Sequence, residues 1–210
     1  MRFLDHAEAG RLLARRLVGT SLRRPAVLAI APEGPRIARE VARWLDAPMD
    51  IMTASAVGIP GRNCGPLGTV VDGAFYPDER ACRDQGVTLD YARILAWPEQ
   101  GKEERWERSV RSNRPAIDVA GRSVIVVSDV ALDRDRLVAI RDALQERKAR
   151  QVLHLAVLAR PEGGDLRAPI LTITLFTTEE SRSVMLVNAG YEQTTESEIA
   201  ELLAAAGAAS

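Results

Sequence analysis

The chain has 210 residues, of which 46% are hydrophobic, 27% charged and 4% aromatic. Its formal net charge at pH 7 is −1, which argues against a dedicated nucleic-acid binder, because neutralising phosphates needs clustered positive charge. Length and composition are those of one globular domain, and we expect residues 1–210 to form it.

The sequence also bears on where the protein works. No apolar run approaches the roughly 18 residues of a membrane span, and the N-terminus lacks the apolar stretch of a signal peptide. The two cysteines, Cys64 and Cys82, are far apart and form no metal-binding pair, as suits free thiols in a reducing compartment. We therefore expect a cytoplasmic protein that binds neither membranes nor nucleic acids.

The first elements predict a β-α-β unit. Asp5 and Glu8 resemble a capping box, and Pro35 stands where the first turn of a helix tolerates proline. The predicted elements are a helix over 5–18, a strand over 26–30, a helix over 35–45 and a strand over 49–53. A β-α-β unit implies a parallel sheet with a right-handed crossover.

The middle of the chain is irregular and then polar. Residues 57–73 are rich in glycine and proline and predict an extended loop ending in a short strand over 69–71. Residues 75–85 have no regular pattern, and residues 88–110 predict a helix broken at Pro98. Because that helix is polar nearly all round, we expect it to form an arm or cover. Trp97 and Trp106 lie on it, and we expect them to pack beneath it, with stacking on a partner as the alternative.

The stretch from Gly121 to Arg150 organises the second half. A buried strand over Val124–Val127 leads into Ser128 and Asp129, and an amphipathic helix follows. Ligands of open α/β sheets bind at the carboxyl ends of the strands, so we expect the chemistry between Ser128 and Arg136. The remaining predicted elements are strands over 151–159 and 170–176, a weak helix over 179–187 and a capped helix over 195–206.

In this order, nearly the whole chain resembles the type I phosphoribosyltransferase-like family, especially its short bacterial members. The resemblance rests on ordered blocks such as Gly58-Ile-Pro-Gly61, Arg114-Pro115 and Tyr191-Glu-Gln-Thr-Thr195. It implies an α/β fold, a parallel twisted sheet flanked by helices, with a hood of about residues 75–115 over the strand ends. Enzymes of this family bind phosphoribosyl pyrophosphate (PRPP) and magnesium, and displace pyrophosphate with a nucleobase or similar nucleophile.

Two of the family's three ligand loops have lost positive charge in this sequence. The first usually reads Pro-Arg-Gly-Gly, whereas this chain has Pro32 in place of the arginine, then Glu33, and keeps only Gly34. Proline also removes a backbone donor. The second usually carries an Arg-Lys pair, which is replaced here by Ser55 and Ala56.

The third loop holds the ribose hydroxyls with two acids and the 5′-phosphate with small residues in the family. Here Ser128 replaces the first acid, Asp129 matches the second, and Asp133 stands where the phosphate-binding threonine would be. No glycine remains, although a nest of amides needs backbone angles that branched residues resist. Arg134 and Arg136 would offset part of the lost positive charge.

The resemblance therefore predicts a degenerate member with no, or very weak, transferase activity that binds another small ligand or a partner. The alternatives are an active phosphoribosyltransferase using PRPP and magnesium, and a regulator that senses a nucleotide or a phosphorylated sugar. We assign no catalytic residue and no metal ligand, expect no cofactor other than magnesium in an active form, and leave a homodimer open. The residues of the ancestral pocket are Glu33, Gly34, Ser55, Ser128, Asp129, Asp133, Arg134 and Arg136.

Several of these acids have a structural interpretation beside the functional one. Asp133 and Asp135 either form a new acidic site or cap and complement the following helix. Glu33 is either a general base or a first-turn carboxylate. Asp129 either holds a ribose hydroxyl or is a buried acid bonded to loop amides.

The isolated histidines and the loop cysteine have weaker claims to function. His6 and His154 stand apart from other candidate ligands, and His154 falls inside a predicted strand, so both are expected to be structural. Cys64 has no neighbouring base in the sequence that would activate it as a nucleophile.

Overall fold

The computed structural model describes residues 5–112, 114–159, 170–177 and 194–207. The predicted loop over 160–169 and the weak helix over 179–187 lie outside these residues. The described elements, in chain order, are α1 (His6–Arg15), β1 (Ala26–Ile30), α2 (Gly34–Leu45), β2 (Met49–Met52), β3 (Ala54–Val57), β4 (Gly68–Val71), β5 (Ala74–Pro77), α3 (Glu79–Asp84), α4 (Leu89–Arg111), β6 (Ser123–Val130), α5 (Arg134–Glu146), β7 (Gln151–Ala159), β8 (Leu171–Thr177) and α7 (Glu196–Gly207).

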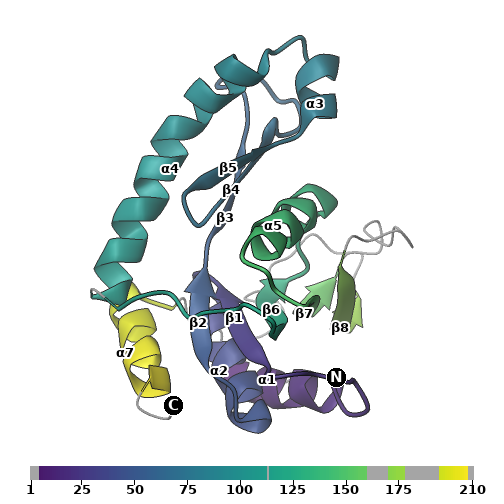
Figure 1. Ribbon diagram of the computed structural model, residues 1–210, viewed down its shortest axis with the longest axis vertical. Helices are drawn as coiled ribbons and strands as arrows, with labels where there is room; N and C mark the ends of the chain where they lie inside the picture. The colour runs from purple at the N-terminus through teal and green to yellow at the C-terminus, as the bar shows by residue number, and fades with distance from the viewer. Residues whose placement is uncertain (1–4, 113, 160–169, 178–193, 208–210) are drawn as a thin grey trace.

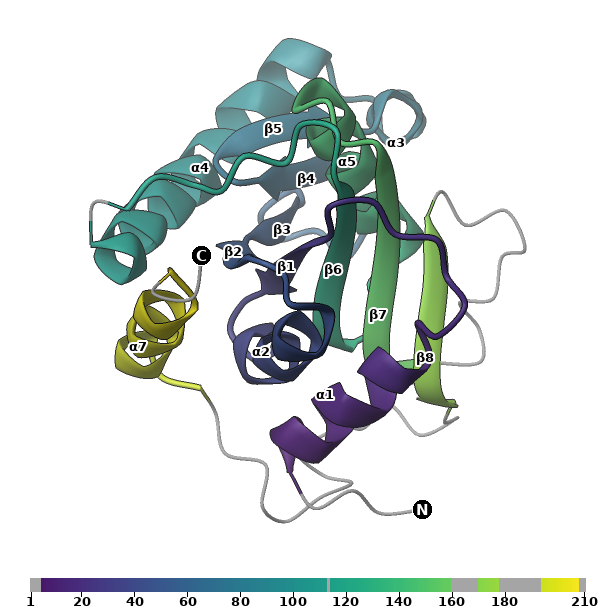
Figure 2. The ribbon, with the colours of Figure 1, turned by 60° about the horizontal axis from the view of Figure 1, so that its bottom comes forward.

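A five-stranded parallel sheet forms the centre of the molecule, in the order β2-β1-β6-β7-β8. Helices α1 and α2 lie together on one of its faces and α5 lies on the other (Figure 2). The α/β class and the parallel sheet predicted from the sequence are confirmed. Strands β1 and β7 have the predicted bounds, whereas β6 continues to Val130 and so includes Ser128 and Asp129.

Both faces of the sheet are buried, which explains the continuous apolar runs of its strands. Val27 and Ala29 of β1 pack into the cluster formed with α1 and α2. Leu28, between them, points to the opposite face and joins the cluster that contains Leu137 and Ile140 of α5. Successive side chains of a strand alternate between faces, so β1 contributes to two apolar layers.

A second sheet was missed by the sequence analysis. Strands β3, β4 and β5 pair antiparallel, and a short helix α3 follows. Only β4 matches a predicted strand, over 69–71, because the rest was expected to be a glycine-rich loop and an irregular segment. Asp72 and Gly73 connect β4 to β5 and both have positive φ, at 46° and 79°. An Asp-Gly pair with this geometry is the turn that two-residue hairpins favour.

Helix α4 runs without a break from Leu89 to Arg111, although a break at Pro98 was expected. Proline removes one N–H from the helix, a limited loss in a helix of 23 residues. The helix stands beside the second sheet, and its carboxyl end lies next to α7 (Figure 1).

A buried ion pair connects α4 to the main sheet. Arg111 donates to the Asp50 carboxylate of β2 and to Glu107, and both Arg111 and Asp50 are buried. On the other side, Arg147, just after α5, lies 3.3 Å from Asp72 in the β4–β5 turn. Among the described helices, none has the length and apolar character needed to cross a membrane.

The two terminal helices begin at the expected capping residues. Asp5 accepts a hydrogen bond of 2.7 Å from the Glu8 N–H at the start of α1, and α1 ends at Arg15, three residues before the predicted end. At α7, Thr195 Oγ1 accepts from the Glu198 N–H while the Glu198 carboxylate accepts from the Thr195 N–H. This reciprocal pair is a capping box.

Candidate functional site

The predicted site lies where β1 and β6 end side by side. The two strands are parallel neighbours in the sheet, so the loops that lead into α2 and α5 leave the same edge. In sheets of this kind that edge is the usual position of a ligand. We refer to the carboxyl-end region formed by residues 31–34 and 128–136 as the crevice.

Glu33 enters the crevice from the first loop. Its Oε2 accepts hydrogen bonds from the N–H and the Oγ1 of Thr194, at 3.4 and 3.3 Å, and lies 3.9 Å from His6 Nε2. Burial, and then the nearby charge of Asp129, raise the pKa of Glu33, while the bonds from Thr194 oppose the rise. Glu33 is the N-cap residue of α2, one position before its first turn, and its side chain makes no capping bond.

Gly34 has a packing role. A Cβ at this position would stand 2.7 Å from the carbonyl oxygen of Val127 in β6, which is closer than real Cβ atoms come. The start of α2 can therefore approach β6 only because residue 34 is a glycine. Packing alone therefore explains why residue 34 is a glycine, without a bound ligand.

Ser128 is held inside the sheet by its neighbours. Its Oγ donates to the Val130 carbonyl at 2.6 Å and lies 2.8 Å from His154 Nε2 on β7. Nδ1 of His154 lies 3.3 Å from Thr172 Oγ1. Burial lowers the pKa of His154 to about 4, so the imidazole is neutral at pH 7 and fills the structural role expected of it.

Asp129 is the remaining acid of the ancestral pair. Burial raises its pKa, and the N–H groups of Val130 and of Asp129 itself, bonded to the carboxylate, lower it in part. The side chain is thus a partly buried acid bonded to N–H groups at the end of β6. Its charge also acts on Glu33, so the crevice brings two acids together.

The acids around α5 are used by the helix. Asp133 Oδ1 accepts from the Arg136 N–H at 2.9 Å, and Oδ2 lies 3.4 Å from Arg136 Nε. The predicted capping role of Asp133 is confirmed. Burial, followed by the charges of Asp78 and Asp133, raises the pKa of Asp135. Arg134 and Asp135 line a separate cavity of about 350 Å³ against β4, β5 and α3.

Ser55 lies in β3, in the second sheet, and its side chain is hydrogen-bonded to Glu103 of α4. The same Glu103 carboxylate accepts from Thr53 Oγ1 at 2.7 Å and from the Gly73 N–H at 3.1 Å. Ser55 therefore helps to attach α4. Sequence reasoning missed Glu103, because a buried acid on a largely polar helix has no local signal.

The other candidates fall into different environments. Cys64 is exposed, and His6 is buried against Glu33. Trp106 packs against a small apolar cluster, whereas the side chain of Trp97 is 66% exposed, so its predicted packing is wrong. Within the described residues, no group of three or more His, Cys, Asp or Glu side chains is arranged to hold a metal ion.

Comparison with known proteins identifies relatives by sequence. Proteins from two strains of Mycobacterium tuberculosis, named "Putative phosphoribosyl transferase", are 32% identical over 130 residues, or 60% of this chain. Over those residues the chain is similar to a phosphoribosyltransferase. The match spans only 29% of the length of those relatives, and no protein-family model matches the chain.

Solved structures of other bacterial proteins share the fold of this chain. The protein TT1426 from Thermus thermophilus superimposes with a TM-score of 0.85 and 26% identity, covering 97% of this chain and 98% of that one. A hypothetical protein from Neisseria gonorrhoeae with bound ppGpp has a TM-score of 0.52 and 13% identity, covering 98% of both chains. At that identity the second likeness concerns the fold alone.

Proposed function

We propose that this phosphoribosyltransferase-like protein transfers phosphoribosyl groups very weakly or not at all, and that its crevice serves to bind a different small ligand or a partner. The observation that carries the proposal is the placement of Glu33, in the loop after β1, and Asp129, near the end of β6, on two neighbouring parallel strands. A receptor for a polyanion needs donors and positive charge at that place. This one presents two carboxylates.

The magnitude of the electrostatic effect supports weak binding of PRPP. A carboxylate about 4 Å from a phosphate charge costs roughly 4 kcal/mol at an effective dielectric constant near 20, or about a thousandfold in affinity. Protonation of Glu33 would reduce this cost, and its raised pKa makes protonation easier at mildly acidic pH. We therefore expect the remaining affinity for phosphates to be greater at low pH.

The start of α5 gives independent support. A helix N-terminus attracts phosphate through its free N–H groups. In this chain the Arg136 N–H is taken by the Asp133 carboxylate, which also places a negative charge where the phosphate would bind. The loop between β6 and α5 thus caps the helix and leaves this N–H group unavailable to a phosphate.

Pyrophosphate release tests the proposal directly. The protein would be incubated with PRPP, magnesium and a panel of nucleobases, with an active phosphoribosyltransferase as positive control. Release at the background rate is expected with every base. Release above background that depends on both protein and base would favour the alternative, an active enzyme.

The second candidate is a regulator that binds a nucleotide or a phosphorylated sugar without transferring it. The protein with bound ppGpp motivates the choice of test ligands, since it combines a similar fold with a nucleotide. A thermal-shift screen is suitable, because a ligand at a hundred times its dissociation constant adds about 2.7 kcal/mol of stability. If no nucleotide or phosphosugar shifts the melting temperature, this candidate is rejected.

A further inference from the structure

A second cavity lies at the opposite edge of the main sheet from the crevice. It has a volume of about 630 Å³, within the range of small-molecule pockets. Met49 at the start of β2 and Arg122 immediately before β6 both line it. Since both strands begin there, the cavity lies at the amino ends of the strands. We call it the amino-end pocket.

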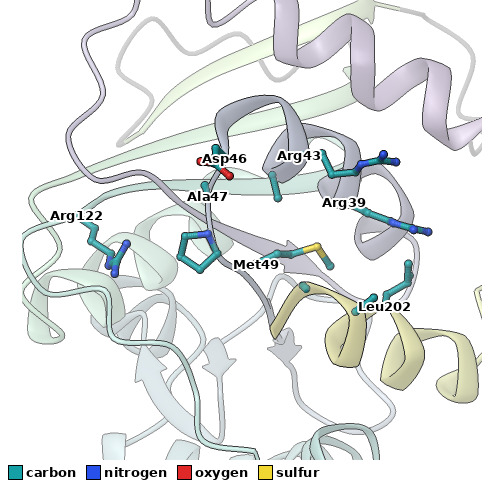
Figure 3. A pocket seen from close by; sticks show the side chains of 11 residues that line it. Arg39, Arg43, Asp46, Ala47, Met49, Arg122 and Leu202 are labelled. Carbon is teal, nitrogen blue, oxygen red and sulfur yellow. The ribbon is translucent and has the colours of Figure 1, made fainter. Parts of the chain in front are cut away.

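The pocket has an apolar wall and positively charged ends. Ala47, Pro48 and Met49 supply part of the wall from the α2–β2 connection, and Leu202 and Ala205 supply another part from α7. Figure 3 shows Arg122 on one side of Met49, and Arg39 and Arg43 of α2 on the other side. The lining contains three arginines and one acid, Asp46, so positive charge predominates.

The arginines differ in how far the protein itself explains them. Arg43 is 3.5 Å from Glu40 and lies in the last turn of α2, where a cation complements the helix dipole. Arg122 is on no helix, is half-buried, and has no side-chain partner within the described part of the chain. Arg39 is exposed and likewise has none among those residues. Since no described acceptor occupies either guanidinium group, both are available to a bound anion.

We propose that the amino-end pocket binds an elongated organic dianion, with an apolar middle against Met49 and a negative group at each end, one for Arg122 and one for Arg39. Guanidinium groups suit carboxylate and phosphate because their donors form a planar fork. The apolar wall suits a hydrocarbon or aromatic body. The pocket shares no lining residue with the crevice, so this inference does not depend on the proposed function.

A matched ligand series tests the charge requirement. Isothermal titration would compare decanedioate, decanoate and decanediol, which carry two, one and no negative charges on the same carbon chain, with octanedioate and dodecanedioate to vary the length. Affinity is expected to fall by about tenfold or more with each lost charge, as for charge-assisted hydrogen bonds. Equal binding of the three decane compounds, or no binding by any dianion, would overturn the proposal.

Substitutions in and beside the lining test whether the dianion binds in the amino-end pocket. Ala205→Trp adds bulk at an exposed helix position that lines the cavity, and should abolish dianion binding. Ala204→Trp, one residue earlier on the same helix and outside the lining, is the matched control and should bind normally. Arg122→Gln should lower decanedioate affinity to that of decanoate. Circular dichroism checks that each variant is folded, and a folded Ala205→Trp protein that still binds would contradict the assignment.

Discussion

The Glu33 carboxylate lies at the start of α2, where backbone N–H groups and the helix dipole would otherwise attract an anion. It is bonded to Thr194 and lies near His6, so it is held at the crevice by segments from both ends of the chain. A single side chain thus determines much of the charge at that edge.

Replacing Glu33 with glutamine tests this effect. Glu33→Gln keeps the size of the side chain and an oxygen that accepts from Thr194, but removes the negative charge. We expect inorganic pyrophosphate, measured by titration at pH 7.5, to bind at least several-fold more tightly than to the parent, with roughly a thousandfold as the upper limit. Glu201→Gln, an exposed change on α7, is the control. Equal affinities in the three proteins would show that Glu33 does not oppose anions.

Asp72, in the β4–β5 turn, makes stability depend on pH. Burial raises its pKa from 3.8 to about 7, against the lowering effect of its bond from the Thr53 N–H. Between about pH 4 and 7 the unfolded chain loses this proton while the folded chain keeps it, so the contribution of Asp72 to stability falls as pH rises. Asp72→Asn, which retains an acceptor for Thr53, should remove this part of the slope. Urea unfolding at pH 4.5 and 7 would measure it, and identical slopes would contradict the assignment.

At the scale of elements, the attachment of α4 depends on a buried ion pair. Arg111 donates to Asp50 and to the Ile51 carbonyl, and Asp50 also accepts from the Ile117 N–H. Arg111→Met should cost about 3–5 kcal/mol in the free energy of unfolding, because it leaves the Asp50 charge buried and unpaired. Arg108→Met, at an exposed position of the same helix, should change it by about 0.5 kcal/mol or less. Similar urea midpoints for the two variants would be evidence against the pair.

The sequence predicted the main sheet because its strands are runs of buried aliphatic residues. Val124–Val127 is such a run, and its parallel neighbours β1 and β7 have the same character. The second sheet has weaker signals, since β3 and β5 are only four residues each and mostly half-exposed. The Asp72-Gly73 pair is typical of a hairpin turn, but the many glycines before it favoured a loop interpretation of the whole segment.

At the scale of the whole molecule, the candidate site was predicted only in part. The strand–loop–helix pattern indicated the segment of Asp129 and Asp133, whereas Glu33 was indicated by the family resemblance. The contacts of Glu33 with His6 and Thr194 join residues far apart in the chain, and no local pattern indicates such contacts. Ser55 contacts α4 and does not lie at the crevice, because β3 belongs to the second sheet and not to the main one.

We retain as a proposal that residues 1–210 form a single domain in which the second sheet, α3 and α4 act as the hood. The ion pairs of Arg111 and Arg147 connect these elements to the main sheet and α5. Thermal unfolding followed by far-UV circular dichroism and by tryptophan fluorescence should therefore give coincident transitions. Tryptophan lies on both α2 and α4, at Trp44 and Trp106. Two separate transitions would indicate independent units.

A titration with PRPP and magnesium at pH 7.5 tests the negative charge of the crevice most directly. We predict no saturable binding in the micromolar range for the parent protein, and detectable binding for Glu33→Gln. Micromolar affinity in the parent that is not improved by Glu33→Gln would contradict the account.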